Sequence, residues 1–167
     1  MISQENAVIL IAEDRPDDVL LIRKALAAAK VTNPFVVLPD GEQTMAYLDG
    51  VGQYADRKMF PMPNIMLLDL KMPKMDGFEV LRAMKTRRHL QHIRVIVLTS
   101  SEDIFDVNKA YELGASSFLV KPLEFENFAG LMRTLNHFWL KRNAMPGDPT
   151  IHSLSETSSS QKATGQN

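Results

Sequence analysis

Five short runs of apolar residues, separated by segments with helical spacing, constrain the fold of this chain most strongly. The runs are rich in Val, Ile and Leu, and polar residues occur only at their ends. They cover residues 7–12, 35–38, 64–69, 94–99 and 117–120. Short apolar runs of this kind are typical of strands buried on both faces, which is the setting of a parallel sheet.

Between these runs, apolar residues recur every three or four positions, which predicts amphipathic helices. The first helix begins near Pro16, a residue that a first helical turn tolerates, and the third is entered through Asp76 and Gly77. The other helices are predicted over residues 42–48, 103–113 and 125–140. Five strands alternating with five helices predict an α/β fold, a doubly wound five-stranded parallel sheet with strand order 2-1-3-4-5.

The chain has 167 residues, enough for one domain with a buried core, which we expect to span residues 1–143. Residues 144–167 are rich in Ser, Thr, Gln, Pro and Gly, which predicts a disordered tail too short to form an output domain. The connection over residues 50–63 is long for an α/β unit, and such connections are often functional or interaction surfaces.

The overall composition narrows the function classes. The net charge is −1 without a basic stretch, so we expect neither a nucleic acid nor a membrane surface as partner. There is no cysteine, which excludes disulfides, thiolate metal sites and a cysteine nucleophile. No apolar run approaches the roughly 20 residues that span a bilayer, and the start does not resemble a signal peptide. We therefore expect a cytoplasmic protein.

Chemically active side chains stand where the predicted strands end. Glu13 and Asp14 follow the first strand, Asp69 ends the third, Thr99 ends the fourth and Lys121 follows the fifth. The carboxyl ends of parallel strands meet at one edge of the sheet. We therefore expect one shared crevice there, between the first and third strands, where the direction of the strand order reverses. Three carboxylates there repel one another, and a cation is the usual counter-charge. Oxygen ligands without His or Cys suit Mg²⁺.

A carboxylate beside Mg²⁺, a lysine and a hydroxyl is typical of phosphoryl transfer. Aspartate can act as a covalent nucleophile and form an aspartyl phosphate. Mg²⁺ and the Lys121 ammonium would stabilise the charge of the transferred group, while the Thr99 hydroxyl donates a hydrogen bond. Taken singly, each residue has an ordinary explanation as a helix cap or a solvated strand end, but the set at one edge does not.

The motifs at these positions resemble the receiver domains of two-component response regulators. The matching segments are Ile-Leu-Ile-Ala-Glu-Asp at 9–14, Leu-Leu-Asp-Leu-Lys-Met-Pro-Lys-Met-Asp-Gly at 67–77, Val-Leu-Thr-Ser at 97–100 and Phe-Leu-Val-Lys-Pro at 118–122. They occur in the family's order and span about residues 7 to 140. The resemblance implies a flavodoxin-like receiver fold and a phosphoacceptor signalling protein rather than an enzyme with a separate substrate.

The resemblance also assigns the site residues. It implies that Asp69 accepts the phosphoryl group from a phosphohistidine of a sensor histidine kinase. It implies that Asp14 and Asp69 ligate Mg²⁺ directly, together with the Lys71 main-chain carbonyl, while Glu13 supports the ion through water. Many receivers have Asp at the position of Glu13, and we expect this difference to tune metal binding rather than abolish it.

Further roles follow from the same resemblance. Thr99 and Phe118 correspond to the coupled switch residues, and Lys121 to the lysine that pairs with phosphate. The Lys121–Pro122 bond corresponds to a cis peptide bond, which would direct the lysine into the site. Lys71 and Ser101 occupy positions at which the family tunes the lifetime of the phosphoryl group.

A finer resemblance connects the chain with stand-alone receivers that are paired with bacterial phytochrome histidine kinases. It rests on the long connection before the third strand and on Phe138, Trp139 and Leu140 near the end of the last helix. Output is expected through protein contacts, with homodimerisation through the fourth helix, fifth strand and fifth helix as one form.

Two other function classes deserve comparison. A hydrolase with an aspartyl-phosphate intermediate usually carries a second Asp two residues after the nucleophile, and Lys71 occupies that position here. A degenerate receiver would bind partners without phosphorylation, but Asp14, Asp69, Thr99 and Lys121 are all intact. The sequence therefore favours an active receiver.

Overall fold

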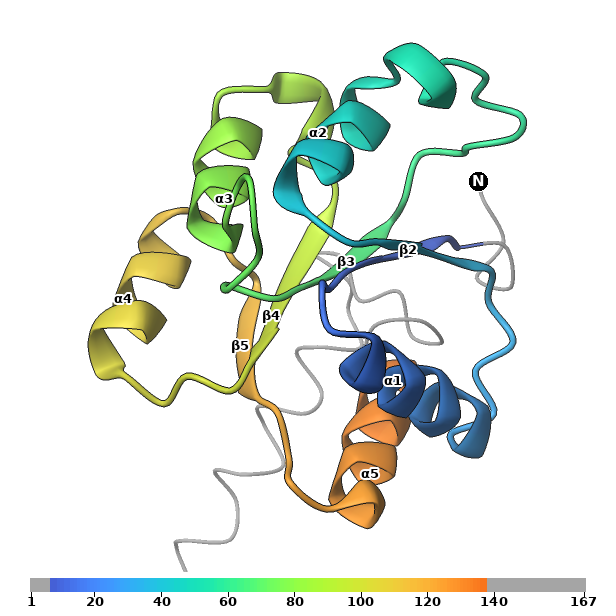
Figure 1. Cartoon of the computed structure of the whole chain (residues 1–167), viewed down its shortest axis with the longest axis vertical. Coiled ribbons are helices and arrows are strands. Elements are labelled where there is room, and N and C mark those ends of the chain that lie inside the picture. Colours follow the sequence, from blue (N-terminus) through green and yellow to red (C-terminus); the bar gives the residue numbers. More distant parts are fainter. Residues whose placement is uncertain (1–6, 138–167) are drawn as a thin grey trace, which may run out of the picture.

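The computed structural model describes residues 7–137, and its five strands form one parallel sheet in the order β2-β1-β3-β4-β5 (Figure 1). The strands are β1 (Ile9–Ala12), β2 (Phe35–Leu38), β3 (Ile65–Leu68), β4 (Arg94–Thr99) and β5 (Ser117–Val120). The helices are α1 (Pro16–Ala28), α2 (Gly41–Asp49), α3 (Gly77–Lys85), α4 (Ile104–Glu112) and α5 (Phe125–Leu135), with short 3-10 turns η2 (Gly52–Tyr54) and η3 (Arg88–Leu90). The predicted fold class and strand order are confirmed.

Burial differs between the centre and the edges of the sheet. Every residue of β1 and β3 is buried, as the continuous apolar runs predicted. Most residues of the edge strands β2 and β5 are only half-buried, so the prediction of full burial was wrong for these two. Each edge strand has a neighbouring strand on one side alone, which leaves its side chains less enclosed.

Helices cover both faces of the sheet, with α1 and α5 on one face and α2, α3 and α4 on the other (Figure 1). On the first face Ile22 and Phe128 pack against the Ile residues of β1. On the second face Met45 and Val80 pack against Leu10 and other residues of the central strands. The alternation along β4 sends Val97 to the second face, and Thr99 lies on the same side by the same period.

The start of α3 lies directly beside Asp69. Asp76 accepts a hydrogen bond from the Glu79 main-chain nitrogen at 2.8 Å, and the Glu79 carboxylate accepts one from the Asp76 nitrogen at 2.8 Å, which forms a capping box. A Cβ atom at Gly77 would lie 2.8 Å from the Leu70 Cα and closer still to the Asp69 carbonyl oxygen. Only glycine lets the helix start approach the strand end this closely, so Asp76 and Gly77 act in turn and cap formation, as predicted.

Two helices depart from the expected amphipathic pattern. In α1, Leu20 is half exposed, and the buried positions are Ile22, Ala25 and Leu26. In α4, Ala110 is the one buried residue, and Phe105 is 78% exposed. The fourth helix is therefore attached through its polar groups and half-buried side chains more than through a large apolar face.

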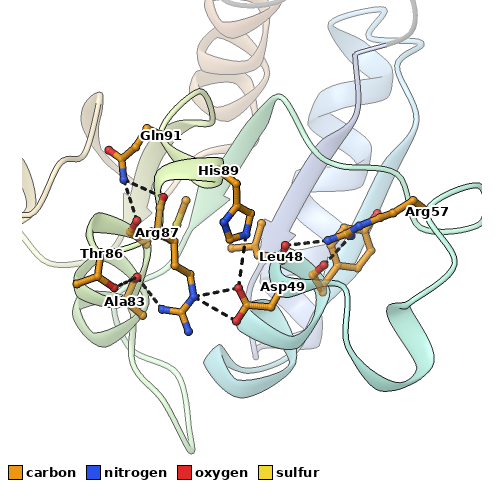
Figure 2. Close-up of polar contacts among 10 residues, drawn as sticks. Leu48, Asp49, Arg57, Ala83, Thr86, Arg87, His89 and Gln91 are labelled. Carbon is orange, nitrogen blue, oxygen red and sulfur yellow. Dashed lines mark hydrogen bonds and ion pairs between the residues drawn. The ribbon is translucent and has the colours of Figure 1, made fainter.

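The long connection between α2 and β3 is a packed structure in its own right. The rings of Tyr47, Tyr54 and Phe60 lie 5.3–6.1 Å apart. The Arg57 guanidinium donates a hydrogen bond of 2.8 Å to the Leu48 main-chain oxygen (Figure 2). It also donates to the main-chain oxygens of Tyr47 at 2.8 Å and of Phe60 at 3.2 Å. Arg57 thus satisfies carbonyls at the carboxyl end of α2, where a cation is favoured.

A second polar group joins α2 to the segment after α3. The Arg87 Nε donates to Asp49 Oδ1 at 2.9 Å, and His89 Nε2 lies 3.7 Å from the same oxygen (Figure 2). The His89 side chain is 55% exposed. These contacts of Asp49 hold α2 and the segment after α3 together at the end of the sheet opposite the acidic crevice.

Several sequence predictions lie outside the described residues. These are the amino-terminal part of the domain before residue 7, the end of the last helix with Phe138, Trp139 and Leu140, and the tail over 144–167. Within residues 7–137, no helix combines the length and apolar character needed to cross a bilayer.

Candidate functional site

The acidic crevice forms where β1 and β3 end beside each other. Ala12 pairs with Leu68 in the parallel ladder, so the next residues of both strands leave the sheet at the same level. Glu13, Asp14 and Asp69 each place a carboxylate oxygen within 4.8 Å of the other two. Glu13 and Asp69 are buried, with 2% and 5% of their surface exposed. The structure therefore brings together the three carboxylates that the sequence placed at this edge.

Lys121, which follows β5, reaches across the crevice to these acids. Its Nζ donates hydrogen bonds to Glu13 Oε2 at 2.5 Å and to Asp69 Oδ2 at 3.2 Å. A third bond, of 2.9 Å, goes to Asp18 Oδ2 on α1. An ammonium has three N–H donors, and all three are used here by carboxylates.

Asp18 is the site residue that the sequence analysis did not single out. It lies in the first turn of α1, where the helix dipole favours a negative charge in any case. It is the third residue of α1, and Asp14 lies before the helix begins, so no helical spacing joins the two acids. The contact itself depends on the distance between α1 and the end of β5, which the sequence does not give.

Burial and neighbouring charges shift the pKa values of Glu13 and Lys121. Burial raises the pKa of Glu13 to about 7, and the nearby Asp69 charge adds to this rise, while the hydrogen bond from Lys121 opposes it. For Lys121, burial lowers the pKa, but the hydrogen bonds to Glu13 and Asp18 and the Asp69 charge outweigh it, so the pKa is raised. The hydrogen bonds to these acids thus favour the charged form of the lysine, whereas burial favours the neutral form of Glu13.

The crevice has the donors that a hard divalent cation requires. Among the described residues, Glu13, Asp14 and Asp69 are the one group of three or more acidic or His side chains arranged to hold a metal ion. Asp14 Oδ1 is buried and has no hydrogen-bond partner within the described part of the chain. A buried carboxylate oxygen without a partner is costly, and a cation would satisfy it. The residues present thus fit a divalent cation.

A hydroxyl group lies at the end of β4 beside this crevice. Thr99 is fully buried, and its Oγ1 accepts a hydrogen bond from the Ser101 main-chain nitrogen at 3.5 Å. The Ser101 hydroxyl donates to Asp106 Oδ2 on α4 at 2.6 Å. The loop after β4 is therefore connected to the first turn of α4, a link that the sequence analysis did not anticipate.

Comparison with known proteins identifies the family. A profile of the response regulator receiver domain matches residues 9–133. The chain belongs to the response-regulator receiver family. The match covers the sheet from β1 to β5 and most of α5, so the acidic crevice lies within the matched domain. Receivers are phosphoacceptor signalling proteins that partner histidine kinases.

The receiver is similar to stand-alone regulators over almost its whole length. It is 35% identical over 144 residues to the response regulator Rcp1 of Synechocystis, which covers 86% of this chain and 96% of Rcp1. The structure of Rcp1 in its Mn²⁺-bound form superposes with a TM-score of 0.75, covering 84% of this chain and 99% of that one.

Two further solved structures are similar to it. The phosphorylated cyanobacterial phytochrome response regulator RcpA is 34% identical with a TM-score of 0.76, covering 84% of this receiver and 97% of RcpA. The bacteriophytochrome response regulator AtBRR is 40% identical with a TM-score of 0.66, covering 86% and 99%. The receiver is thus similar over most of its length to regulators named for phytochromes and bacteriophytochromes.

The remaining residues that the resemblance assigned lie around the crevice. Phe118 is half-buried on β5, paired with Val97, and packs on the same face of the sheet as Thr99. Its main-chain nitrogen donates to the Tyr111 hydroxyl of α4 at 3.1 Å. Lys71 has an exposed side chain, and its main-chain nitrogen lies 3.4 Å from Asp69 Oδ1.

The expected cis peptide bond at Lys121–Pro122 is not present. No peptide bond within residues 7–137 is cis, so this prediction was wrong. The trans isomer is the more stable form of an X–Pro bond by about 0.5–1 kcal/mol. Lys121 reaches all three carboxylates with the trans bond, so its direction into the crevice does not require the other isomer.

Proposed function

We propose that this receiver accepts a phosphoryl group on Asp69 from the phosphohistidine of a sensor histidine kinase, in a reaction that requires Mg²⁺. The observation that carries the proposal is the burial of the Asp69 carboxylate between two further carboxylates and the Lys121 ammonium. Asp69 faces the cation position on one side and the lysine on the other. That is the arrangement needed to offset the charge of an incoming phosphoryl group.

The cation position is formed by Asp14 and Asp69 as direct ligands, with Glu13 acting through a water molecule and the Lys71 main-chain carbonyl as a further ligand. The Asp14 Oδ1 atom, which has no hydrogen-bond partner among residues 7–137, and the Mn²⁺-bound form of Rcp1 support a divalent ion at this place. Mg²⁺ suits these oxygen donors, and when bound it neutralises charge on the phosphoryl oxygens.

In the transfer, an Asp69 carboxylate oxygen forms a bond to phosphorus as the bond from phosphorus to the donor histidine nitrogen breaks. The Lys121 ammonium releases Asp69 Oδ2 and donates that hydrogen bond to a phosphoryl oxygen. The Thr99 hydroxyl donates another, because a charged acceptor makes a stronger hydrogen bond than a neutral one. Positioning and electrostatics thus supply the catalysis.

The signal leaves the site through Thr99 and Phe118. Both lie on the face of the sheet covered by α4, and a shift of the Thr99 hydroxyl towards phosphate frees space into which the Phe118 ring turns. Packed interiors permit few intermediate arrangements, so a small shift becomes a two-state change. Ser101, tied to Asp106 of α4, and Lys71 set the lifetime of the phosphoryl group.

The decisive experiment uses Asp69→Asn, which keeps the side-chain shape but removes the nucleophile. With acetyl phosphate and Mg²⁺, the unaltered protein should gain the mass of one phosphoryl group, and Asp69→Asn should gain none. Phosphate mapped to another residue in the variant would show that the acceptor is wrong. Rapid turnover of generic phosphomonoesters without a stable adduct would instead support a hydrolase.

The kinase partner that we propose is a bacterial phytochrome. RcpA and AtBRR, which resemble this receiver over nearly all of their length, are named as phytochrome or bacteriophytochrome regulators. Purified phosphorylated phytochrome kinases should transfer their phosphoryl group within seconds, whereas kinases with other sensor domains should be much slower. Equal transfer rates from both groups would argue against this partner. The cytoplasmic location remains a prediction from the sequence.

Homodimerisation through α4, β5 and α5 is the form of output that we propose. This face has exposed apolar side chains, among them Tyr111 at 49% and Val120 at 38% exposure. Phe138, which lies outside the described residues, is the first position to alter. Sedimentation should reveal more dimer with beryllofluoride, and Phe138→Ala should remove the increase. An unchanged mass distribution with the phosphoryl mimic would reject this output.

A further inference from the structure

The Lys121 ammonium donates hydrogen bonds to three carboxylates, and one of these lies outside the cation position. Glu13 and Asp69 belong to the group that can hold a metal ion, whereas Asp18 does not. Asp18 Oδ2 nevertheless accepts a hydrogen bond of 2.9 Å from Lys121, which is shorter than the 3.2 Å bond to Asp69. Asp18 is thus the one partner of the lysine that a bound cation leaves free.

A cation in the crevice would weaken the other two contacts of the lysine. A divalent ion takes up lone pairs of Asp69 and polarises Glu13, and its positive charge repels the ammonium. The lysine side chain is only 9% exposed, so water solvates its ammonium poorly. An acid outside the metal group is therefore needed to keep the ammonium in place while the ion is bound.

The location of Asp18 suits this task. It occupies the first turn of α1, where the helix dipole stabilises a negative charge, and its side chain is 20% exposed. Arg15 Nε lies 3.9 Å from the same Oδ2 atom, on the solvent side. The rigid helix fixes the carboxylate, and a group held on a helix positions its partner more accurately than one held on a loop.

We propose that Asp18 is a positioning residue that holds the Lys121 ammonium beside Asp69 when the cation is bound, so that the lysine is in place for the phosphoryl group. The proposal rests on the proposed function of the crevice. Asp18 does not touch the phosphoryl group or the cation. It acts through Lys121 alone, by keeping one hydrogen bond to the ammonium while another donor turns from Asp69 to phosphate.

The test compares Asp18→Ala with Asp17→Ala in the full-length protein. Asp17 is exposed and lies in the same helical turn, so its variant removes the same charge without contacting the lysine. At saturating Mg²⁺, Asp18→Ala should slow phosphorylation by acetyl phosphate about tenfold, the loss expected for one charge-assisted hydrogen bond. Asp17→Ala should match the unaltered protein. Equal rates in both variants, or a faster rate in Asp18→Ala, would overturn the proposal.

A second background shows whether Asp18 acts through the lysine. In Lys121→Gln, adding Asp18→Ala should cause no further loss of rate, and an undiminished tenfold loss there would overturn the proposal. Asp18→Asn keeps a hydrogen-bond acceptor and should recover part of the rate, which a purely structural role of the charge would not predict.

Metal binding provides a readout that does not depend on phosphorylation. Without Asp18, Lys121 binds Glu13 and Asp69 more closely, so these acids are less available to the ion. The Kd for Mg²⁺, measured by calorimetry without any phosphodonor, should rise about tenfold in Asp18→Ala and stay unchanged in Asp17→Ala. An unchanged Kd in Asp18→Ala would contradict the inference. If no variant, including the unaltered protein, takes up phosphate, the proposed function fails while this measurement still tests Asp18.

Discussion

Replacing Asp14 by Asn should raise stability in metal-free buffer, and Mg²⁺ should remove or reverse this advantage over the unaltered protein. In metal-free buffer the three carboxylates of the crevice lie within 4.8 Å of one another, and Lys121 donates no hydrogen bond to Asp14. Two unit charges at that distance repel by about 3.5 kcal/mol at an effective dielectric constant of 20. Attraction to the lysine and partial protonation of Glu13 reduce this, which leaves a net relief of about 1–3 kcal/mol in Asp14→Asn.

This relief should appear as a higher melting temperature. For a domain of this size about 1 kcal/mol corresponds to about 4 °C, so the metal-free variant should melt about 4–12 °C above the unaltered protein. With Mg²⁺ the order should reverse or the gap should close. The unaltered protein gains about 2.7 kcal/mol when the ion is present at a hundred times its Kd, and the variant lacks a direct ligand.

The assay is thermal melting followed by circular dichroism, in EDTA and in a series of Mg²⁺ concentrations. Asp17→Asn serves as the control, because it removes one exposed negative charge from the neighbouring helix without entering the crevice. An equal Mg²⁺ shift in Asp14→Asn and in the unaltered protein would falsify the assigned cation position. A lower melting temperature of the variant in EDTA would refute the repulsion on which the magnitude rests.

Three further predictions concern pH, the connection before β3, and the tail. Burial raises the pKa of Glu13 to about 7 from its ordinary 4.5, so the folded protein holds this proton more tightly than the unfolded chain. Without metal, the free energy of unfolding should therefore fall as pH rises from 4.5 to 7. Urea midpoints of Glu13→Gln should lack this fall. Arg57→Ala removes three hydrogen bonds to main-chain carbonyls and should cost about 2–4 kcal/mol in urea unfolding, whereas Lys58→Ala, an exposed cation of the same connection, should cost under about 0.5 kcal/mol. Deleting residues 144–167 should leave the melting temperature within about 1 °C and phosphorylation unaltered, and a fall of many degrees would mean that the tail docks on the domain.

The strands were predictable because their signal is local. The range predicted for β4 matches Arg94–Thr99, and those for β2 and β5 also match, since apolar runs bounded by polar residues mark the length of a strand even at the half-buried edges of the sheet. The parallel order then follows from the alternation with helices, and it places Asp69 beside Glu13 without knowledge of any side-chain contact. The gathering of the carboxylates is therefore a consequence of topology.

Contacts between elements were not predictable in the same way. The bond from Lys121 to Asp18 depends on how α1 is inclined against the end of β5, and the bond from Ser101 to Asp106 depends on the path of a loop. The three contacts of Arg57 likewise arise from the folded shape of the connection after α2, in which no periodic pattern exists. Sequence periodicity describes which face of an element is buried, but not which polar groups meet across two elements.

The order in which the ribosome makes the crevice separates its acids from their counter-charge. Lys121 is 108 residues further along the chain than Glu13, so at about 5–20 residues per second it is synthesised roughly 5–20 s later. During that interval the nascent chain already holds Glu13, Asp14 and then Asp69, and the strand that brings the ammonium does not yet exist. Until then, protons and cations from the surrounding solution offset the charge of these three acids. Translation of β5 and Lys121 thus supplies the positive charge that offsets the acids following β1 and β3.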